Sequence, residues 1–274
     1  MSRKVVFLDI DGTLTNFNGE LPDSAAEALA KARANGHRMV ICTGRAHNQI
    51  YSFLMDSGLF DGVVCSTGCD VRVDGKAVYQ HTMTREMRYK LIDLCERTEA
   101  TYILQGANGC YAKREIMERE GALFPGDPVD KEKRKELFGE IQTSDDIYSH
   151  EDIEKACYYS AKASIEEIRE ALGEEFTVAE SSYKLQDGSS DGEVTVTGYD
   201  KGFGMEKFLE AVGALREDSV AFGDGPNDYE MLDFAAVSVA MGNAADELKA
   251  HADYVTERVD RDGLALGFKR LGLI

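Results

Sequence analysis

The sequence is poor in positive charge and has no long apolar runs. Its 31 lysine and arginine residues are outnumbered by 50 aspartate and glutamate residues, which gives a formal net charge of −19. Binding to a nucleic-acid backbone needs clustered Lys and Arg that displace counterions, so we expect no nucleic-acid partner. No run is long enough to span a membrane, and the few residues before the first apolar segment are too short for a signal peptide. We therefore expect no membrane association and a cytoplasmic location.

Several catalytic signatures are also absent. The six cysteines include no C-x-x-C pair, and none is followed six positions later by the arginine of a thiol-phosphatase loop. The phosphate-binding pattern G-x-x-x-x-G-K-[ST] does not occur, and no two of the five histidines are four residues apart. These absences argue against thiol catalysis, a P-loop and a zinc hydrolase. We interpret the cysteines as free thiols in a reducing compartment.

With 274 residues, the chain is near the size at which one hydrophobic core divides into two. Apolar strands alternate with amphipathic helices at both ends of the sequence, whereas the middle contains two helices, at 85–97 and 164–172, and a hairpin signal at Asn108-Gly109. The predicted fold class is α/β, with a doubly wound, Rossmann-like parallel-sheet core and an inserted α+β cap. We assign residues 1–80 and 189–274 to the core and 81–188 to the cap.

The core elements follow from apolar runs, helix caps and glycine stops. Buried strands are predicted at 5–8, 37–43, 63–65, 220–222, 237–240 and 254–255, and a hairpin turns at Asp74-Gly75. Helices are predicted at about 24–35, from Arg45 to about Ser57, at 201–212, at 227–234 and at 244–250.

Acidic residues follow two of these strands, at opposite ends of the chain. Asp9-Ile-Asp11-Gly-Thr13 comes after one apolar strand, and Gly223-Asp224-Gly-Pro-Asn-Asp228 comes after another. Open α/β sheets bind ligands where the carboxyl ends of their strands meet, so we expect these carboxylates to gather at one edge. Carboxylate oxygens are the ligands that Mg²⁺ prefers.

These residue types suit phosphate-ester cleavage, which depends on positioning and on neutralising charge. Asp9 is a candidate nucleophile, and Asp11, two residues further on, is a candidate acid and base for the leaving oxygen and the hydrolytic water. Thr43 and the N–H of Gly44 follow a second strand and are placed to bind phosphate. Lys201 would supply positive charge to an otherwise acidic pocket.

Taken together, the motifs resemble those of the haloacid dehalogenase superfamily, in particular its Cof-type, sugar-phosphatase-like subfamily IIB with a C2 cap. The matching segments are Asp9-x-Asp11-Gly-Thr-Leu-Thr15, Thr43-Gly44-Arg45, Lys201-Gly202, Gly223-Asp224-Gly-x-Asn227-Asp228 and Ala240-Met-Gly-Asn-Ala244. The resemblance implies that Asp9 is the nucleophile and Asp11 the acid/base. It further implies phosphate binding by Thr43, Gly44, Lys201 and Asn227, and Mg²⁺ binding by Asp9, Asp11, Asp224 and Asp228, with Asp11 acting through its backbone carbonyl. Thr67-Gly68 departs from the Asn-Gly that is frequent in this family.

The expected activity is Mg²⁺-dependent hydrolysis of small phosphorylated metabolites through an aspartyl-phosphate. Sugar phosphates are the first candidates, and flavin mononucleotide, pyridoxal phosphate and nucleotides are further ones. Two alternatives stay open: a phosphosugar mutase of similar build and a non-catalytic phosphate sensor. A calcium loop starting at Asp9 is disfavoured, because its sixth position is Leu14 instead of Gly. The sequence leaves the oligomeric state open between a monomer and a weak dimer.

Overall fold

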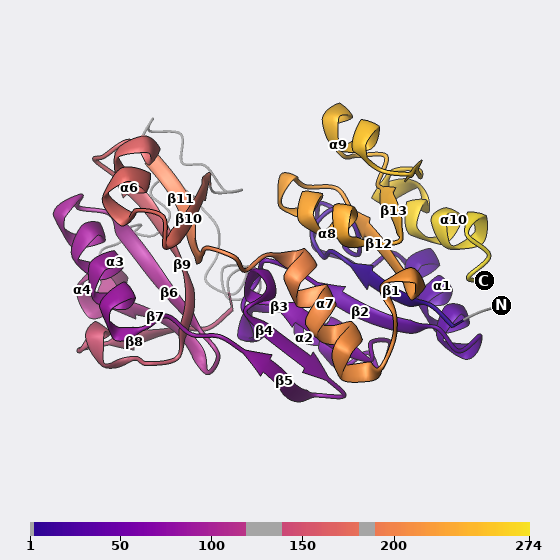
Figure 1. Cartoon of the computed structure of the whole chain (residues 1–274), viewed down its shortest axis with the longest axis horizontal. Helices are drawn as coiled ribbons and strands as arrows, with labels where there is room; N and C mark the ends of the chain where they lie inside the picture. Colours follow the sequence, from indigo (N-terminus) through magenta and orange to yellow (C-terminus); the bar gives the residue numbers. More distant parts are fainter. Residues whose placement is uncertain (1–2, 119–138, 181–189) are drawn as a thin grey trace. The chain divides into compact units, whose positions relative to one another are not determined.

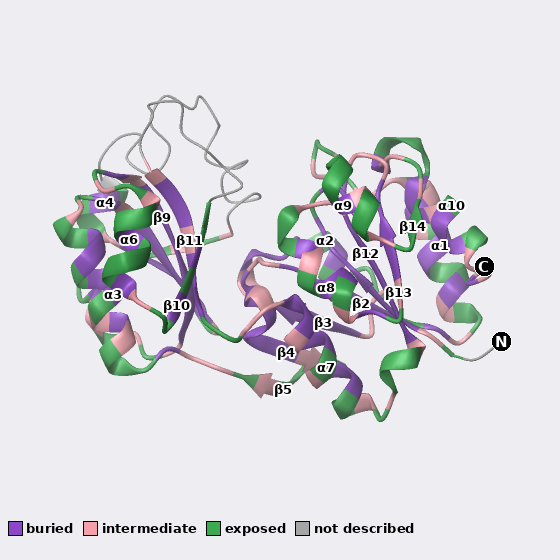
Figure 2. Ribbon diagram, turned by 45° about the horizontal axis from the view of Figure 1, so that its top comes forward, coloured by how far each residue is buried: buried purple, intermediate pink, exposed green. Residues whose placement is uncertain are grey.

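The computed structural model describes residues 3–118, 139–180 and 190–274, and the chain forms two compact units (Figure 1). Unit 1 contains Met1–Arg45, Ser52–Gln80 and Asp200–Ile274, and unit 2 contains Ala46–Tyr51 and His81–Tyr199. The strands of both units are largely buried, whereas their helices expose one side, as the colouring of Figure 2 shows.

Unit 1 is built on an eight-stranded sheet in the order β14-β13-β12-β1-β2-β3-β4-β5. The pairings from β14 to β3 are parallel, and β4 and β5 continue the sheet in antiparallel fashion. This arrangement confirms the α/β class with a parallel core. The strands are β1 (Val5–Leu8), β2 (Arg38–Cys42), β3 (Gly62–Cys65), β4 (Asp70–Val73), β5 (Lys76–Gln80), β12 (Ser219–Gly223), β13 (Val237–Ala240) and β14 (Tyr254–Val255).

Helices cover both faces of this sheet. Phe7 of β1 packs edge-on against Phe208 of α7, with ring centroids 5.6 Å apart, and Phe222 of β12 packs against Phe268 of α10 at 5.3 Å. Phe7 and Phe222 point to opposite faces, because Phe7 is paired in register with Ala221 and successive side chains of a strand alternate. The helices are α1 (Asp23–Ala34), α2 (Ser52–Met55), α7 (Lys201–Val212), α8 (Tyr229–Phe234), α9 (Asp246–His251) and α10 (Gly263–Arg270).

The predicted continuous helix from Arg45 to about Ser57 is wrong. The chain forms a single 3₁₀ turn at His47–Gln49, and the helix α2 has only four residues. Ile50 between them has extended angles (φ −71°, ψ 133°), which interrupt the helical hydrogen bonds. The Gln49 side chain instead accepts a hydrogen bond from the Ala46 N–H. Helix α10 was not predicted, although Leu264 and Phe268 are one helical turn apart and both are buried.

Unit 2 has a six-stranded sheet in the order β10-β11-β9-β6-β7-β8, antiparallel except for β7 and β8. Helices α3 and α6 pack on it through Leu91, Ile92, Ile168 and Leu172, which meet Tyr158 in one core. The elements are α3 (Arg85–Arg97), β6 (Thr101–Gly106), β7 (Gly109–Lys113), α4 (Arg114–Glu118), β8 (Ile141–Ser144), β9 (Ile153–Ala161), α6 (Ile165–Leu172), β10 (Phe176–Glu180) and β11 (Ser190–Val196).

The segment limits differ from those expected. The predicted boundary between 188 and 189 lies outside the described residues, but Ser190–Val196 pairs with β9 and β10 in the second sheet, so unit 1 resumes only at Asp200. The short segment Ala46–Tyr51, expected in the core, groups with unit 2. Both differences arise because strand pairing and side-chain contacts, not local composition, decide which core a segment joins.

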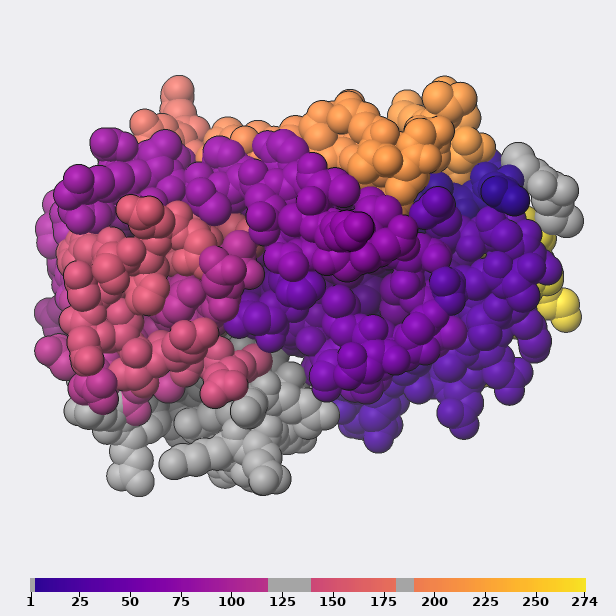
Figure 3. All heavy atoms as spheres, turned by 90° about the horizontal axis from the view of Figure 1, so that it is seen from below, coloured from indigo at the N-terminus to yellow at the C-terminus, as the bar shows by residue number. Residues whose placement is uncertain are grey.

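The C-terminal residues pack against the N-terminal region of the chain within unit 1. Figure 3 shows C-terminal residues next to N-terminal ones, and the Asn35 side chain donates a hydrogen bond to the Leu273 carbonyl at 2.9 Å. Across the three described ranges, no helix combines the length and the apolar character needed to cross a membrane.

Candidate active site

The register of the parallel strands brings the two acidic stretches together. Leu8 of β1 pairs with Phe222 of β12, and the Asp9 N–H donates to the Phe222 carbonyl at 3.1 Å. The next residues of these two strands, Asp9 and Gly223, therefore emerge side by side, and Asp224 follows. On the other side Leu8 pairs with Ile41 of β2, which places Thr43 at the same edge.

Three carboxylates form one cluster at this edge. Oxygen atoms of Asp9, Asp224 and Asp228 lie within 4.8 Å of one another. The Lys201 ammonium donates to Asp9 Oδ1 and to Asp228 Oδ1, at 2.6 Å in each case, and its side chain is fully buried. Lys201 occupies the first turn of α7, where the side chain of Asp200 caps the helix by accepting a hydrogen bond from the Phe203 N–H.

The cluster carries more negative than positive charge. Three carboxylates and one ammonium leave a formal charge of −2 (−3 + 1), with Asp9 and Asp228 buried and Asp224 half-buried. Burial raises the pKa of Asp9 to about 8, against the opposing effect of Lys201, and burial also raises the pKa of Asp224 to about 6. Lys201 keeps its proton, because Asp228 and Asp9 raise its pKa although burial alone would lower it. Without a cation, the site therefore holds a proton among its carboxylates.

Asp228 mainly organises the loop after β12. Its Oδ2 accepts hydrogen bonds from the N–H groups of Asp224 and Gly225, at 2.8 and 2.9 Å, while its Oδ1 accepts from Lys201. The side chain is fully buried. It therefore fixes the backbone that presents Asp224.

The sequence reasoning missed two residues that hold Asp224. Thr13 Oγ1 donates to Asp224 Oδ1 at 2.9 Å, and Asn243 Nδ2 donates to Asp224 Oδ2 at 3.0 Å. Asn243 also donates to the Gly12 carbonyl and accepts from the Val259 N–H, both at 2.9 Å. It thus ties the loop after β1 to the loop after β12. Both residues lie within segments that carry the family resemblance, and this resemblance could have identified them as site residues.

Asp11 lies apart from the buried cluster. Its carboxylate forms a two-point ion pair with Arg45, in which Nε and Nη2 each donate at 2.8 Å. The Asp11 side chain is 52% exposed. The acid/base role of Asp11 stays a prediction.

The remaining predicted residues line the same edge to different degrees. Thr43 is buried, and its Oγ1 accepts from the Arg45 N–H, which leaves its hydroxyl hydrogen for a further acceptor. Gly44 follows it directly. Asn227 is exposed in the 3₁₀ turn Pro226–Asp228, and within the described ranges no hydrogen bond joins it to Lys201. The phosphate-binding roles of these residues stay predictions.

The departure at Thr67-Gly68 has a structural consequence. Thr67 has left-handed angles (φ 55°, ψ 41°), which Asn adopts more readily than a β-branched residue. Gly68 (φ 89°) is required, because a Cβ there would lie 2.1 Å from the Asp200 carbonyl. The turn therefore packs closely against the start of α7, which carries Lys201.

A parallel α/β sheet that presents clustered carboxylates and a buried lysine at the carboxyl ends of its strands defines a phosphohydrolase-type site. The family model described as "haloacid dehalogenase-like hydrolase" matches residues 6–268. The chain therefore belongs to the haloacid dehalogenase-like hydrolase family.

Relatives and solved structures agree with this. The chain is 27% identical to pyridoxal phosphate phosphatase YbhA of Escherichia coli (97% of each chain) and 25% identical to phosphatase YwpJ of Bacillus subtilis (98% of this chain, 99% of the relative). Among solved structures, it is similar to the HAD subclass IIB sugar phosphatase BT4131, with 28% identity, a TM-score of 0.81 and coverage of 99% and 100%. The Cof-type, subclass IIB resemblance is confirmed, and the chain is a phosphoric monoester hydrolase.

Proposed function

We propose that this protein is a Mg²⁺-dependent phosphatase that hydrolyses small phosphorylated metabolites, sugar phosphates foremost, through an aspartyl-phosphate at Asp9. One observation carries the proposal: three clustered carboxylates, two of them paired with the Lys201 ammonium, give the carboxyl edge of the sheet a formal charge of −2. A divalent cation would neutralise that charge.

The donor set fits Mg²⁺. Hard carboxylate oxygens from Asp9 and Asp224 face a common space, and Asp228 orients the loop that carries Asp224. In proteins Mg²⁺ is usually bound by only a few carboxylates, and its other coordination positions are filled by water and phosphate oxygens. The backbone carbonyl of Asp11 is the further ligand that we propose. When bound, the cation neutralises charge on the phosphoryl oxygens and on the nucleophile.

The chain's own residues divide the remaining work. An Asp9 oxygen attacks phosphorus while the bond to the leaving oxygen breaks, and Asp11 gives that oxygen its proton. Water then attacks the aspartyl-phosphate, Asp11 takes the proton of the water, and Asp9 is released with inorganic phosphate. Asp11 must leave Arg45 in order to act as an acid, and its exposure leaves room for that movement. Thr43, Gly44, Lys201 and Asn227 would hold the phosphoryl oxygens.

Unit 2 is the proposed cap that selects the leaving group. The names of relatives cover several substrates: a sugar phosphatase, a pyridoxal phosphate phosphatase and, at 23% identity over 95% of this chain, a 5-amino-6-(5-phospho-D-ribitylamino)uracil phosphatase of Bacillus subtilis. All of these substrates are small phosphorylated metabolites.

We place the protein in the cytoplasm, because its six cysteines are buried and free of disulfides.

Removal of divalent cations should abolish the phosphatase activity. With a panel of sugar phosphates, pyridoxal phosphate and p-nitrophenyl phosphate, we expect phosphate release to stop in EDTA and to return when Mg²⁺ is added in excess. Full activity in EDTA would contradict the metal role. Conversion of a sugar phosphate into an isomer without release of phosphate would instead identify a mutase, and no turnover at all with Mg²⁺ would favour a sensor.

Asn243→Ala tests the residue that holds Asp224. The variant loses the bonds to Asp224, to the Gly12 carbonyl and from Val259, so we expect kcat/KM to fall by about 10- to 100-fold and the Mg²⁺ concentration for half-maximal activity to rise. The matched control is Gln80→Ala, at an exposed position of β5, which should change neither value. An Asn243→Ala enzyme with unchanged metal dependence would show that Asp224 does not need this support.

A further inference from the structure

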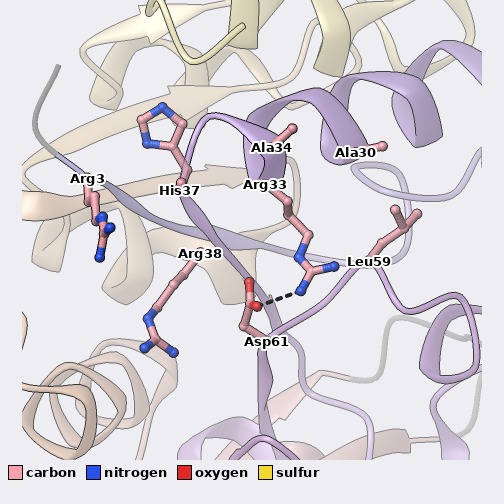
Figure 4. Close-up of a pocket in the computed structure, with 9 residues that line it drawn as sticks. Arg3, Ala30, Arg33, Ala34, His37, Arg38, Leu59 and Asp61 are labelled. Atoms are coloured by element: carbon pink, nitrogen blue, oxygen red, sulfur yellow. Dashed lines mark hydrogen bonds and ion pairs between the residues drawn. The ribbon is translucent and has the colours of Figure 1, made fainter.

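A basic groove lies at the other end of the unit 1 sheet. It has a volume of about 570 Å³, and its lining includes Arg3, Arg33, Gly36, Arg38, Leu59 and Asp61 (Figure 4). Arg3 precedes β1, Arg38 begins β2 and Asp61 precedes β3, so the groove lies at the amino ends of parallel strands. Asp9 lies six residues after Arg3, which at about 3.3 Å per residue is roughly 20 Å away.

One arginine of the groove is held in place by its neighbours. Arg33 Nη2 donates to Asp61 Oδ1 at 2.8 Å, and Nη1 donates to the Gly58 carbonyl. The other Asp61 oxygen accepts from the Met39 N–H at 2.8 Å. Asp61 therefore has both oxygens engaged and fixes one wall of the groove. The C-terminal turn of α1 also favours a positive charge at Arg33.

Arg3 and Arg38 have no such compensation. Among residues 3–118, 139–180 and 190–274, no ion pair or side-chain hydrogen bond involves either guanidinium. The lining carries three arginines and one aspartate, a formal charge of +2 (+3 − 1), in a chain whose net charge is −19. Two unpaired cations on one concave surface of so acidic a protein call for an anion.

The other walls restrict what the anion can be. Ala30, Ala34 and Leu59 form an apolar side. A guanidinium group can donate two parallel hydrogen bonds to two oxygens of a phosphate group. An apolar wall accommodates the organic part of a phosphate ester.

We propose that this groove is a second anion site, distinct from the catalytic edge, that binds a phosphate-bearing small molecule through Arg3 and Arg38. The shared chemistry is a phosphoryl or diphosphoryl group. Its two possible sources are free inorganic pyrophosphate and an organic diphosphate such as ADP, which would also contact Leu59.

The test is an NMR titration of the isotope-labelled, full-length Asp9→Asn variant in EDTA, with pyrophosphate and ADP as separate probes. We expect saturable shifts of the amides of Arg3, Gly36 and Arg38, half complete at or below about 1 mM. The double variant Arg3→Gln/Arg38→Gln should raise that concentration at least tenfold for both probes. Tighter binding of ADP than of pyrophosphate would assign the organic diphosphate as the source, and the reverse would assign pyrophosphate.

The matched control removes the same charge elsewhere in unit 1. Lys76→Gln/Arg261→Gln changes two exposed cations outside the groove, and we expect binding to remain within twofold of the parent. Equal weakening by this control pair would show a general charge effect and overturn the proposal. Absence of saturation at 10 mM, or shifts confined to Thr43 and Gly44, would overturn it as well.

Discussion

The variant Asp9→Asn is expected to lose turnover almost completely, by at least about 10⁴-fold in kcat, while keeping its fold. An amide oxygen is too weak a nucleophile to form the acyl phosphate, and removal of a nucleophile usually costs most of the chemical acceleration. The measurement is phosphate release under saturating Mg²⁺ and substrate, with circular dichroism as the check on folding. The matched control is Asp56→Asn, at an exposed position, which should retain wild-type turnover.

The same variant should also change how the folding stability depends on pH. In the metal-free protein, burial raises the pKa of Asp9 to about 8 from an ordinary value of 3.8, so ionising this group opposes folding. Wild-type stability should therefore decrease as the pH rises from 4 to 8, and Asp9→Asn should lack this part of the decrease. Denaturant unfolding in EDTA at several pH values measures the difference.

For the turnover prediction, an Asp9→Asn variant that keeps a tenth of wild-type turnover would contradict covalent catalysis by Asp9.

Lys201→Met should be the most destabilising single change at the site. It removes the ammonium that lies 2.6 Å from both Asp9 and Asp228 and leaves two buried carboxylates without their partner. Loss of one member of a buried ion pair typically costs about 3–5 kcal/mol. We also expect kcat to fall by at least about 100-fold, because a positive charge near the phosphoryl group is lost.

Two comparisons keep this prediction testable if Lys201→Met folds poorly. Lys201→Met/Asp228→Asn removes one of the stranded charges, so it should recover part of the lost stability but none of the activity. Mg²⁺ should stabilise Lys201→Met more than it stabilises the wild type. The control is Lys76→Met, an exposed lysine of β5. A Lys201→Met protein as stable as this control would contradict the prediction, because it would mean that the buried carboxylates do not need the ammonium.

Much of the fold followed from local patterns. The local sequence pattern placed α1, α3 and α7 to within one or two residues, because each pattern is contained in its own segment. The segment after Arg45 failed for the opposite reason. Its apolar residues suited a helix, but Ile50 is extended and Ala46–Tyr51 joins the core of unit 2, a choice made by contacts distant in sequence.

The candidate site divides in the same way. The acidic types at Asp9, Asp11, Asp224 and Asp228 are visible in the sequence, and so is their position after buried strands. The partners that hold them are not. Asp11 pairs with Arg45, which is 34 positions away in the sequence. Asn243 binds Asp224, 19 positions away, and the Gly12 carbonyl, 231 positions away. Each of these contacts depends on how loops from different strands meet.

By itself, the sequence determined the α/β class, the strands that end in acidic residues and the family chemistry, because these depend on residue types and short-range order. Only the tertiary structure decided that Lys201 lies between Asp9 and Asp228, that Asp11 pairs with Arg45 at the rim, and that Arg3 and Arg38 share a groove at the far end of the sheet. The physical reason is strand register: parallel pairing of β1 with β2 and β12 sets which distant residues meet at each edge, and no local pattern encodes that alignment.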